Sequence, residues 1–136
     1  MEKWNRICRS VLKHKDKNSK EDIFQTEMEY IFEYILGWSD DEIVPQKRNK
    51  VFSANAYAPD IIIRSNEHNL IIVELKRPNI SLEKHRNQLF DYMRLKYSQV
   101  GLLIGDKLQV FCEIPINSNP PKLILDIDFI KDNPYG

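Results

Sequence analysis

Hydrophobic residues change their spacing along this chain, and the changes divide it into helices and strands. Apolar side chains recur every three or four residues in 2–15, 20–36 and from Ser81 to about Tyr97. This spacing is typical of amphipathic helices with one buried face. Gly37 follows the second segment and is suited to end that helix, because glycine tolerates the left-handed conformation of a helix C-terminus.

The other apolar runs are short and bounded by turn residues, which predicts strands. One strand or strand pair is expected within 43–52. Residues 99–104 and 107–112 are expected to form a hairpin around Gly105-Asp106, and the weakly alternating run 123–127 to add an edge strand. Helical and strand patterns therefore alternate, which predicts an α/β domain.

The most informative pattern is a pair of apolar runs on either side of the polar turn Arg64–Asn69. Ile61–Ile63 and Leu70–Val73 are apolar at consecutive positions. Uninterrupted apolar runs are typical of strands that are covered on both faces. We therefore expect a β-hairpin in the middle of the sheet.

Three charged residues gather at one end of this hairpin. Asp60 begins its first strand, and Glu74 and Lys76 end its second. Side chains two apart on a strand share a face, and the start of one antiparallel strand lies beside the end of its partner. A salt bridge at a strand end would explain such a cluster, but carboxylates near buried strands are costly unless paired or metal-bound. We expect a Mg²⁺ site, because Mg²⁺ binds one or two carboxylates and retains several waters.

Lys76 would have a different task in such a site. A protonated lysine cannot bind a metal, but it can steady an attacking water or a developing negative charge. Paired carboxylates also occur in glycosidases, whose sites do not call for a lysine two residues from one acid.

Pro59-Asp60 followed by Glu74-Leu75-Lys76 resembles the signature of PD-(D/E)xK nucleases. The surrounding motifs are similar, in order, to those of the N-terminal nuclease domain of type I restriction enzyme motor subunits and their stand-alone relatives. These motifs are Ala58–Ile63, Ile72–Pro78, Gln88–Tyr92 and Gly101–Gly105. The resemblance implies a restriction-endonuclease-like α/β fold, a mixed sheet of about five strands flanked by helices. It also implies Mg²⁺-dependent hydrolysis of DNA phosphodiester bonds, with Mn²⁺ as a substitute, in restriction, defence or DNA processing.

The resemblance further suggests accessory residues for the site. Gln88 and Tyr92 match a Gln-x-x-x-Tyr motif, and their spacing places them on one helical face, where they would help to position the substrate strand or Lys76. Many of these nucleases also direct a first-helix glutamate to the metal. Glu27 matches the shorter family spacing and Glu21 the longer, and Glu27 is the preferred candidate.

Composition does not by itself indicate a nucleic-acid-binding protein. The chain has 20 basic and 20 acidic residues, so its formal net charge is zero and contacts to DNA would depend on local clusters. Lys47, Arg48 and Lys50 are the preferred contacts, because they precede the predicted site. The lysine-rich connector at 14–20 is more simply interpreted as a solvated loop.

At 136 residues the chain is expected to hold one main domain. We expect an N-terminal helix and basic connector at 1–20, a nuclease domain at 21–130 and a tail at 131–136. Cys8 and Cys112 fit no metal-binding spacing, no apolar run approaches 18 residues, and the N-terminus lacks a signal-peptide core. These features favour a cytoplasmic protein without membrane contact. Its expected partners are DNA and further domains or subunits of a restriction complex. The alternative is a nuclease-fold binding module that cleaves nothing by itself.

Overall fold

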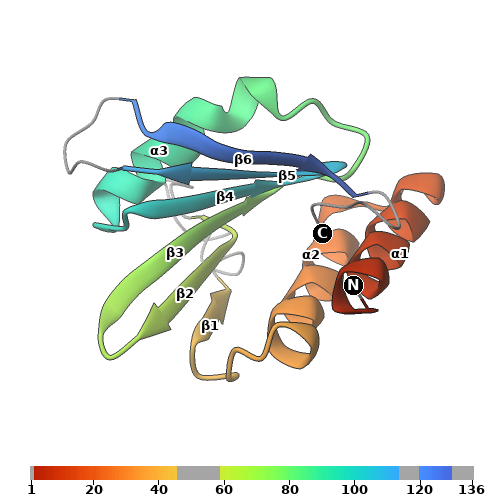
Figure 1. Ribbon diagram of the computed structural model, residues 1–136, viewed down its shortest axis with the longest axis horizontal. Coiled ribbons are helices and arrows are strands. Elements are labelled where there is room, and N and C mark those ends of the chain that lie inside the picture. The colour runs from red at the N-terminus through yellow and green to blue at the C-terminus, as the bar shows by residue number, and fades with distance from the viewer. Residues whose placement is uncertain (1, 46–58, 114–119, 130–136) are drawn as a thin grey trace.

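A computed structural model describes residues 2–45, 59–113 and 120–129 of the chain (Figure 1). Its elements in chain order are α1 (Glu2–Asp16), α2 (Glu21–Tyr30), the π-helical turn η1 (Ile31–Ile35), β1 (Ile43–Pro45), β2 (Ile61–Ser65), β3 (His68–Leu75), the 3-10 turn η3 (Glu83–His85), α3 (Arg86–Leu95), β4 (Val100–Ile104), β5 (Lys107–Cys112) and β6 (Lys122–Asp128).

The strands form one six-stranded sheet in the order β1-β2-β3-β4-β5-β6. Every neighbouring pair is antiparallel except β3 and β4, which run parallel. A parallel pair needs a crossover connection, and the segment carrying η3 and α3 supplies it. This mixed α/β architecture is consistent with a restriction-endonuclease-like fold and confirms the predicted fold class.

The sheet has six strands, where the sequence predicted about five. The weakly alternating run at its C-terminal end does form an edge strand, β6. Its alternation is weak because Leu123, Ile124 and Leu125 all remain exposed, so neither face of this part of the strand is strongly buried.

Helices cover both faces of the sheet, and each face has its own hydrophobic core. On one face, α3 packs Leu89 and Met93 against the alternate strand positions Ile62, Ile72 and Leu103. On the other face, α1 and α2 cover the intervening positions of the same strands. Both faces of the central hairpin are thus buried, as its uninterrupted apolar runs predicted.

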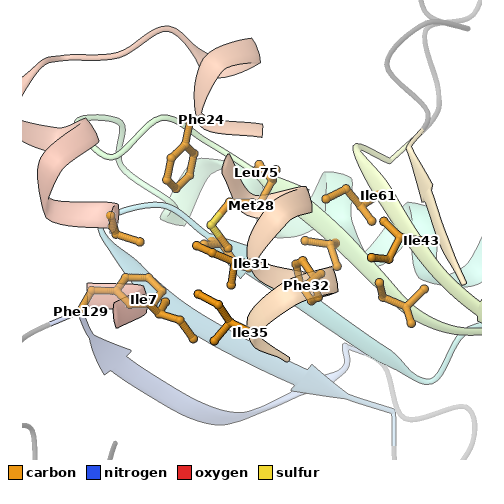
Figure 2. Close-up of a cluster of buried hydrophobic side chains, with 14 of the residues drawn as sticks. Ile7, Phe24, Met28, Ile31, Phe32, Ile35, Ile43, Ile61, Leu75 and Phe129 are labelled. Carbon is orange, nitrogen blue, oxygen red and sulfur yellow. The ribbon is translucent and has the colours of Figure 1, made fainter. Parts of the chain in front are cut away.

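The core beneath α1 and α2 joins the N-terminal helix to the rest of the domain. Figure 2 shows Ile7 of α1 and Phe24 and Met28 of α2 in one cluster with Ile61 and Leu75 of the sheet. Helix α1 therefore packs as part of the same core that supports the hairpin.

Two predicted helices are shorter or less regular than their patterns suggested. The predicted helix 20–36 begins as α2 but ends in the π-helical turn η1, after which Gly37 adopts φ +88°. The predicted helix that starts at Ser81 begins as the 3-10 turn η3 and becomes α-helical only at Arg86. It ends at Leu95, and Tyr97 takes a positive φ of 56°, so the chain turns towards β4 before the apolar pattern stops.

The turn of the central hairpin is tighter than its polar sequence suggested. Only Asn66 and Glu67 lie outside the strands, and both have positive φ angles, of 51° and 65°. Two central residues with positive φ form the type I′ turn, whose twist matches that of the flanking strands. This turn sets the pairing next to it, and an irregularity between Ile63 and Arg64 shifts the register by one residue before the strands reach the opposite end of the hairpin.

Cys8 and Cys112 are buried free thiols. In the part of the chain that the structure describes, no helix has the length and apolar character required to cross a bilayer.

Candidate active site

The open end of the β2–β3 hairpin brings Asp60 beside Glu74. The register pairs Ile61 with Val73 and Ile62 with Ile72, so Asp60 and Glu74 are the next positions beyond the paired strands. The backbone N–H of Asp60 donates to Oε1 of Glu74 at 3.1 Å, and the backbone N–H of Leu75 donates to Oδ2 of Asp60 at 2.8 Å. The predicted proximity of the two acids is confirmed.

Both carboxylates are buried rather than exposed at a strand end. Asp60 is 3% and Glu74 1% exposed. Glu74 lies two residues after Ile72 and therefore shares the face of β3 on which α3 packs. Burial removes water from the charged groups, so their hydrogen bonds to backbone N–H groups compensate only part of the lost solvation.

Lys76 lies just beyond β3 and faces these acids. Its backbone N–H donates to the carbonyl of Ile104 at 2.9 Å, which extends the parallel contact between β3 and β4. Its Nζ lies 3.9 Å from Oε2 of Glu74 and 3.8 Å from Oε1 of Glu21. The ammonium group is therefore held between the central hairpin and the start of α2.

The structure brings Glu21, and not the preferred candidate Glu27, to this cluster. Glu27 accepts a hydrogen bond from Ser10 of α1, and its other carboxylate oxygen lies 3.9 Å from His14 Nε2. Six residues of α-helix amount to about 600° of rotation, so the two glutamates point in different directions. The geometry therefore favours Glu21 as the α2 acid beside Lys76, whereas Glu27 binds α1; which glutamate reaches a metal stays a prediction.

Gln88 and Tyr92 contact each other, as their helical spacing predicted. Gln88 Nε2 donates to Tyr92 Oη at 3.2 Å, with Gln88 exposed and Tyr92 fully buried. Tyr92 belongs to the hydrophobic cluster that contains Ile62 and Ile72, so it lies on the same face of the sheet as Glu74. The Gln88–Tyr92 pair therefore lies on the side of the sheet that carries the Glu74 carboxylate.

Two residues that the sequence did not assign to the site also lie near the cluster. Gln25 is buried, and its Nε2 donates to the backbone carbonyl of Asp60 at 3.2 Å. Its position four residues after Glu21 was the available signal, because residues four apart share a helical face. His85 is the second, since burial, followed by the charges of Lys76 and Lys84, lowers the pKa of its ring below the ordinary value of 6.5.

Lys47, Arg48 and Lys50, the predicted contacts to nucleic acid, lie outside the described residues. Their role stays a prediction.

Few side chains at this site could bind a metal ion directly. Within residues 2–45, 59–113 and 120–129, no three His, Cys, Asp or Glu side chains lie close enough together to hold an ion. Asp60 and Glu74 nevertheless fit Mg²⁺, because this cation binds one or two carboxylates and takes its remaining ligands from water and phosphate oxygens.

Comparison with known protein families identifies a match. A model of the PD-(D/E)XK nuclease superfamily matches residues 5–111, which include most of α1, the central hairpin, α3 and nearly all of β5. No curated protein and no solved structure matches the chain. The matched region contains the residues described above at the site: Glu21, Gln25, Asp60, Glu74, Lys76, Gln88 and Tyr92.

Proposed function

Because the chain belongs to the PD-(D/E)XK nuclease superfamily, we propose that it is a Mg²⁺-dependent nuclease that hydrolyses DNA phosphodiester bonds. The observation that carries this proposal is the buried pair Asp60 and Glu74 with the Lys76 ammonium beside it. Two acids and a lysine at the end of one hairpin provide ligands for a cation and a separate positive charge for the substrate.

Each residue of the cluster has a distinct task in this proposal. Asp60 and Glu74 hold the cation, with Mn²⁺ as an alternative to Mg²⁺. A bound Mg²⁺ stabilises negative charge on a phosphate and makes a water molecule more acidic. Lys76 stabilises the charge that develops on the phosphate, and its contact with Glu21 keeps the ammonium group in place. Gln25 fixes the backbone of Asp60, the residue that begins the site.

Burial strengthens the electrostatic interactions that Lys76 makes at the site. Electrostatic interactions weaken in water, whereas Lys76 acts beside a carboxylate that is 1% exposed. Donors that are already oriented need no rearrangement as charge develops, which is the main source of electrostatic catalysis.

We further propose a cytoplasmic role in restriction, defence or DNA processing, with further domains or subunits of a restriction complex as partners. The similarity of the ordered motifs to type I motor subunits supports this role.

Cleavage assays test the proposal directly. Circular and linear DNA are incubated with the parent protein in Mg²⁺, Mn²⁺ or EDTA, and cutting of the circle identifies an endonuclease. We expect cleavage with either metal and none in EDTA. Lys76→Ala should lower the rate by roughly 100-fold or more, the usual cost of removing one charge-stabilising donor.

Lys96→Ala is the matched control. The carbonyl of Lys96 accepts a hydrogen bond from Asn69, near the hairpin turn and therefore at the opposite end of β3 from Lys76. This control should cleave like the parent. A Lys76→Ala variant that cleaves normally with Mg²⁺ would overturn the assigned mechanism. A parent that never cleaves would favour the non-cleaving binding module.

A further inference from the structure

The last turn of α1 and the connector to α2, residues 13–20, form an ordered segment, which we call the basic turn. Its backbone has the Schellman arrangement that commonly ends helices. Asn18 adopts a positive φ of 49° and donates its N–H to the carbonyl of Lys15 at 3.1 Å. Ser19 donates its N–H to the carbonyl of His14 at 3.0 Å, and its Oγ lies 2.8 Å from His14 Nδ1. Hydrogen bonds therefore fix a segment that the sequence presented as a solvated loop.

This basic turn is fastened to the loop that follows the site lysine. Asn79 Nδ2 donates to Asn18 Oδ1 at 2.8 Å and lies 3.3 Å from the carbonyl of Lys15. Asn79 comes three residues after Lys76. A second link follows at once, because Glu21, the first residue after the basic turn, contacts Lys76 at 3.8 Å. Two contacts from different elements thus place the basic turn beside the site.

The basic turn carries a concentrated positive charge in a chain whose formal net charge is zero. It contains four exposed lysines and a single acidic residue, Asp16. Within the part of the chain that the structure describes, Lys13, Lys15, Lys17 and Lys20 form no ion pair with a carboxylate. Their charge is therefore available to an external anion.

The acidic residues beside the basic turn explain why positive charge there would favour binding of a phosphate backbone. Asp60, Glu74 and Glu21 place three carboxylates near one Lys76 ammonium, so a phosphate backbone approaching the cluster meets local negative charge. Lysines that contact the phosphates next to the scissile one would offset this repulsion and orient the strand.

We propose that the basic turn is a phosphate-binding surface that holds the DNA backbone on the α1–α2 side of the site. This inference rests on the proposed nuclease function and adds the path that the substrate takes across the molecule. Contacts to phosphate carry no sequence information, so the basic turn sets position and affinity rather than sequence preference.

Binding measurements test the inference without cleavage. A short fluorescent DNA duplex is titrated in EDTA at several salt concentrations, and its anisotropy gives the Kd. The test variant is Lys15→Glu/Lys17→Glu/Lys20→Glu. The control is Arg64→Glu/Lys96→Glu/Lys122→Glu, which makes the same change in net charge on exposed or half-buried residues at the opposite end of the sheet.

We expect the test variant to bind at least tenfold more weakly than the control. A milder variant, Lys15→Ala/Lys17→Ala/Lys20→Ala, should reduce the slope of log Kd against log salt by about 0.9 for each phosphate contact that is lost. Thermal melts of all variants identify any loss of folding, and the alanine variant decides the matter if the glutamate variant unfolds.

The outcomes separate the two proposals. If the parent binds and cleaves, and the test and control variants bind alike, the inference is overturned and the nuclease function stands. If the parent binds through the basic turn but never cleaves, the inference stands and the nuclease function fails. A parent that does not bind the duplex even at low salt overturns the inference.

Discussion

Asp60 and Glu74 are linked through the backbone: the N–H of Asp60 donates to Glu74 Oε1 at 3.1 Å, while the N–H of Leu75 donates to Asp60 Oδ2 at 2.8 Å. Each acid therefore has a neutral donor that fixes its position. These hydrogen bonds orient the carboxylates but do not neutralise them. The two carboxylates lie close together in a buried place, and the Lys76 ammonium, 3.9 Å from Glu74, offsets only part of their repulsion, so a bound metal ion should stabilise the pair.

Asp60→Asn separates a metal site from a structural salt bridge. The asparagine Oδ1 can still accept from the Leu75 N–H, but the repulsion from Glu74, on the order of 1 kcal/mol or more, disappears. In EDTA the variant should melt at the same temperature as the parent or higher. In Mg²⁺ the parent should gain stability that the variant lacks, because a ligand that binds only the folded state raises its stability. A destabilised variant, together with a parent indifferent to Mg²⁺, would indicate a salt bridge.

Glu21→Gln and Glu27→Gln should have different effects. Glu21 contacts Lys76, so its replacement should reduce DNA cleavage by roughly 10-fold, within the range for residues that orient a catalytic group. Glu27 accepts from Ser10 of α1, and a glutamine could still accept there, so its replacement loses only the charge and should lower the free energy of unfolding by no more than about 1 kcal/mol and leave cleavage within about twofold. Cleavage rates and thermal melts measure the two effects. The reverse result would restore Glu27 as the first-helix acid of the site.

Tyr92→Phe tests the accessory pair on α3. The variant keeps the buried ring and removes the hydroxyl that accepts from Gln88. Cleavage should fall, while the free energy of unfolding should change by about 1 kcal/mol, the net worth of one hydrogen bond. Tyr97→Phe is the control, because Tyr97 is 92% exposed. Unchanged cleavage by both Tyr92→Phe and Gln88→Ala would assign the pair a packing role alone.

The pH dependence of stability should carry a contribution from His85. Burial and the charges of Lys76 and Lys84 lower the pKa of His85 in the folded protein, so the unfolded chain binds its proton more readily. The resulting stability is fully present above the unfolded pKa, near 6.5, and is lost as the pH falls through the lower folded value. The melting temperature of the parent minus that of His85→Gln should therefore decrease from pH 8 to pH 5. A constant difference would contradict the shift.

The end of the central hairpin could be predicted because its determinants are local. The alternation of β3 places Glu74 on the face opposite that of Val73. Asp60 lies alongside Glu74 because the register set at the Asn66-Glu67 turn shifts by one residue between Ile63 and Arg64. Strand geometry has a period of two, so the apolar runs identify the buried faces, and the irregularity near the turn adjusts the pairing between the strands.

The position of the first-helix acid could not be predicted in the same way. The apolar stripe of α2 identifies the face that packs on the core, but Glu21 and Glu27 both lie on its borders. The choice between them depends on where α1 packs, because Ser10 and His14 contact Glu27. The link between Asn79 and Asn18 joins residues 61 positions apart and has no local signal.

The short span of the hairpin has a consequence for the order in which the site assembles during folding. Only 14 positions separate Asp60 from Glu74, whereas the backbone bond from Lys76 to Ile104 closes the parallel β3–β4 pair through the α3 crossover. Closing a longer loop costs more chain entropy, and parallel pairing forms slowly. We therefore expect the acidic half of the site to form before β4, the strand that fixes Lys76, has paired. Pulse-labelled hydrogen exchange should show the Leu75 amide becoming protected earlier than the Lys76 amide.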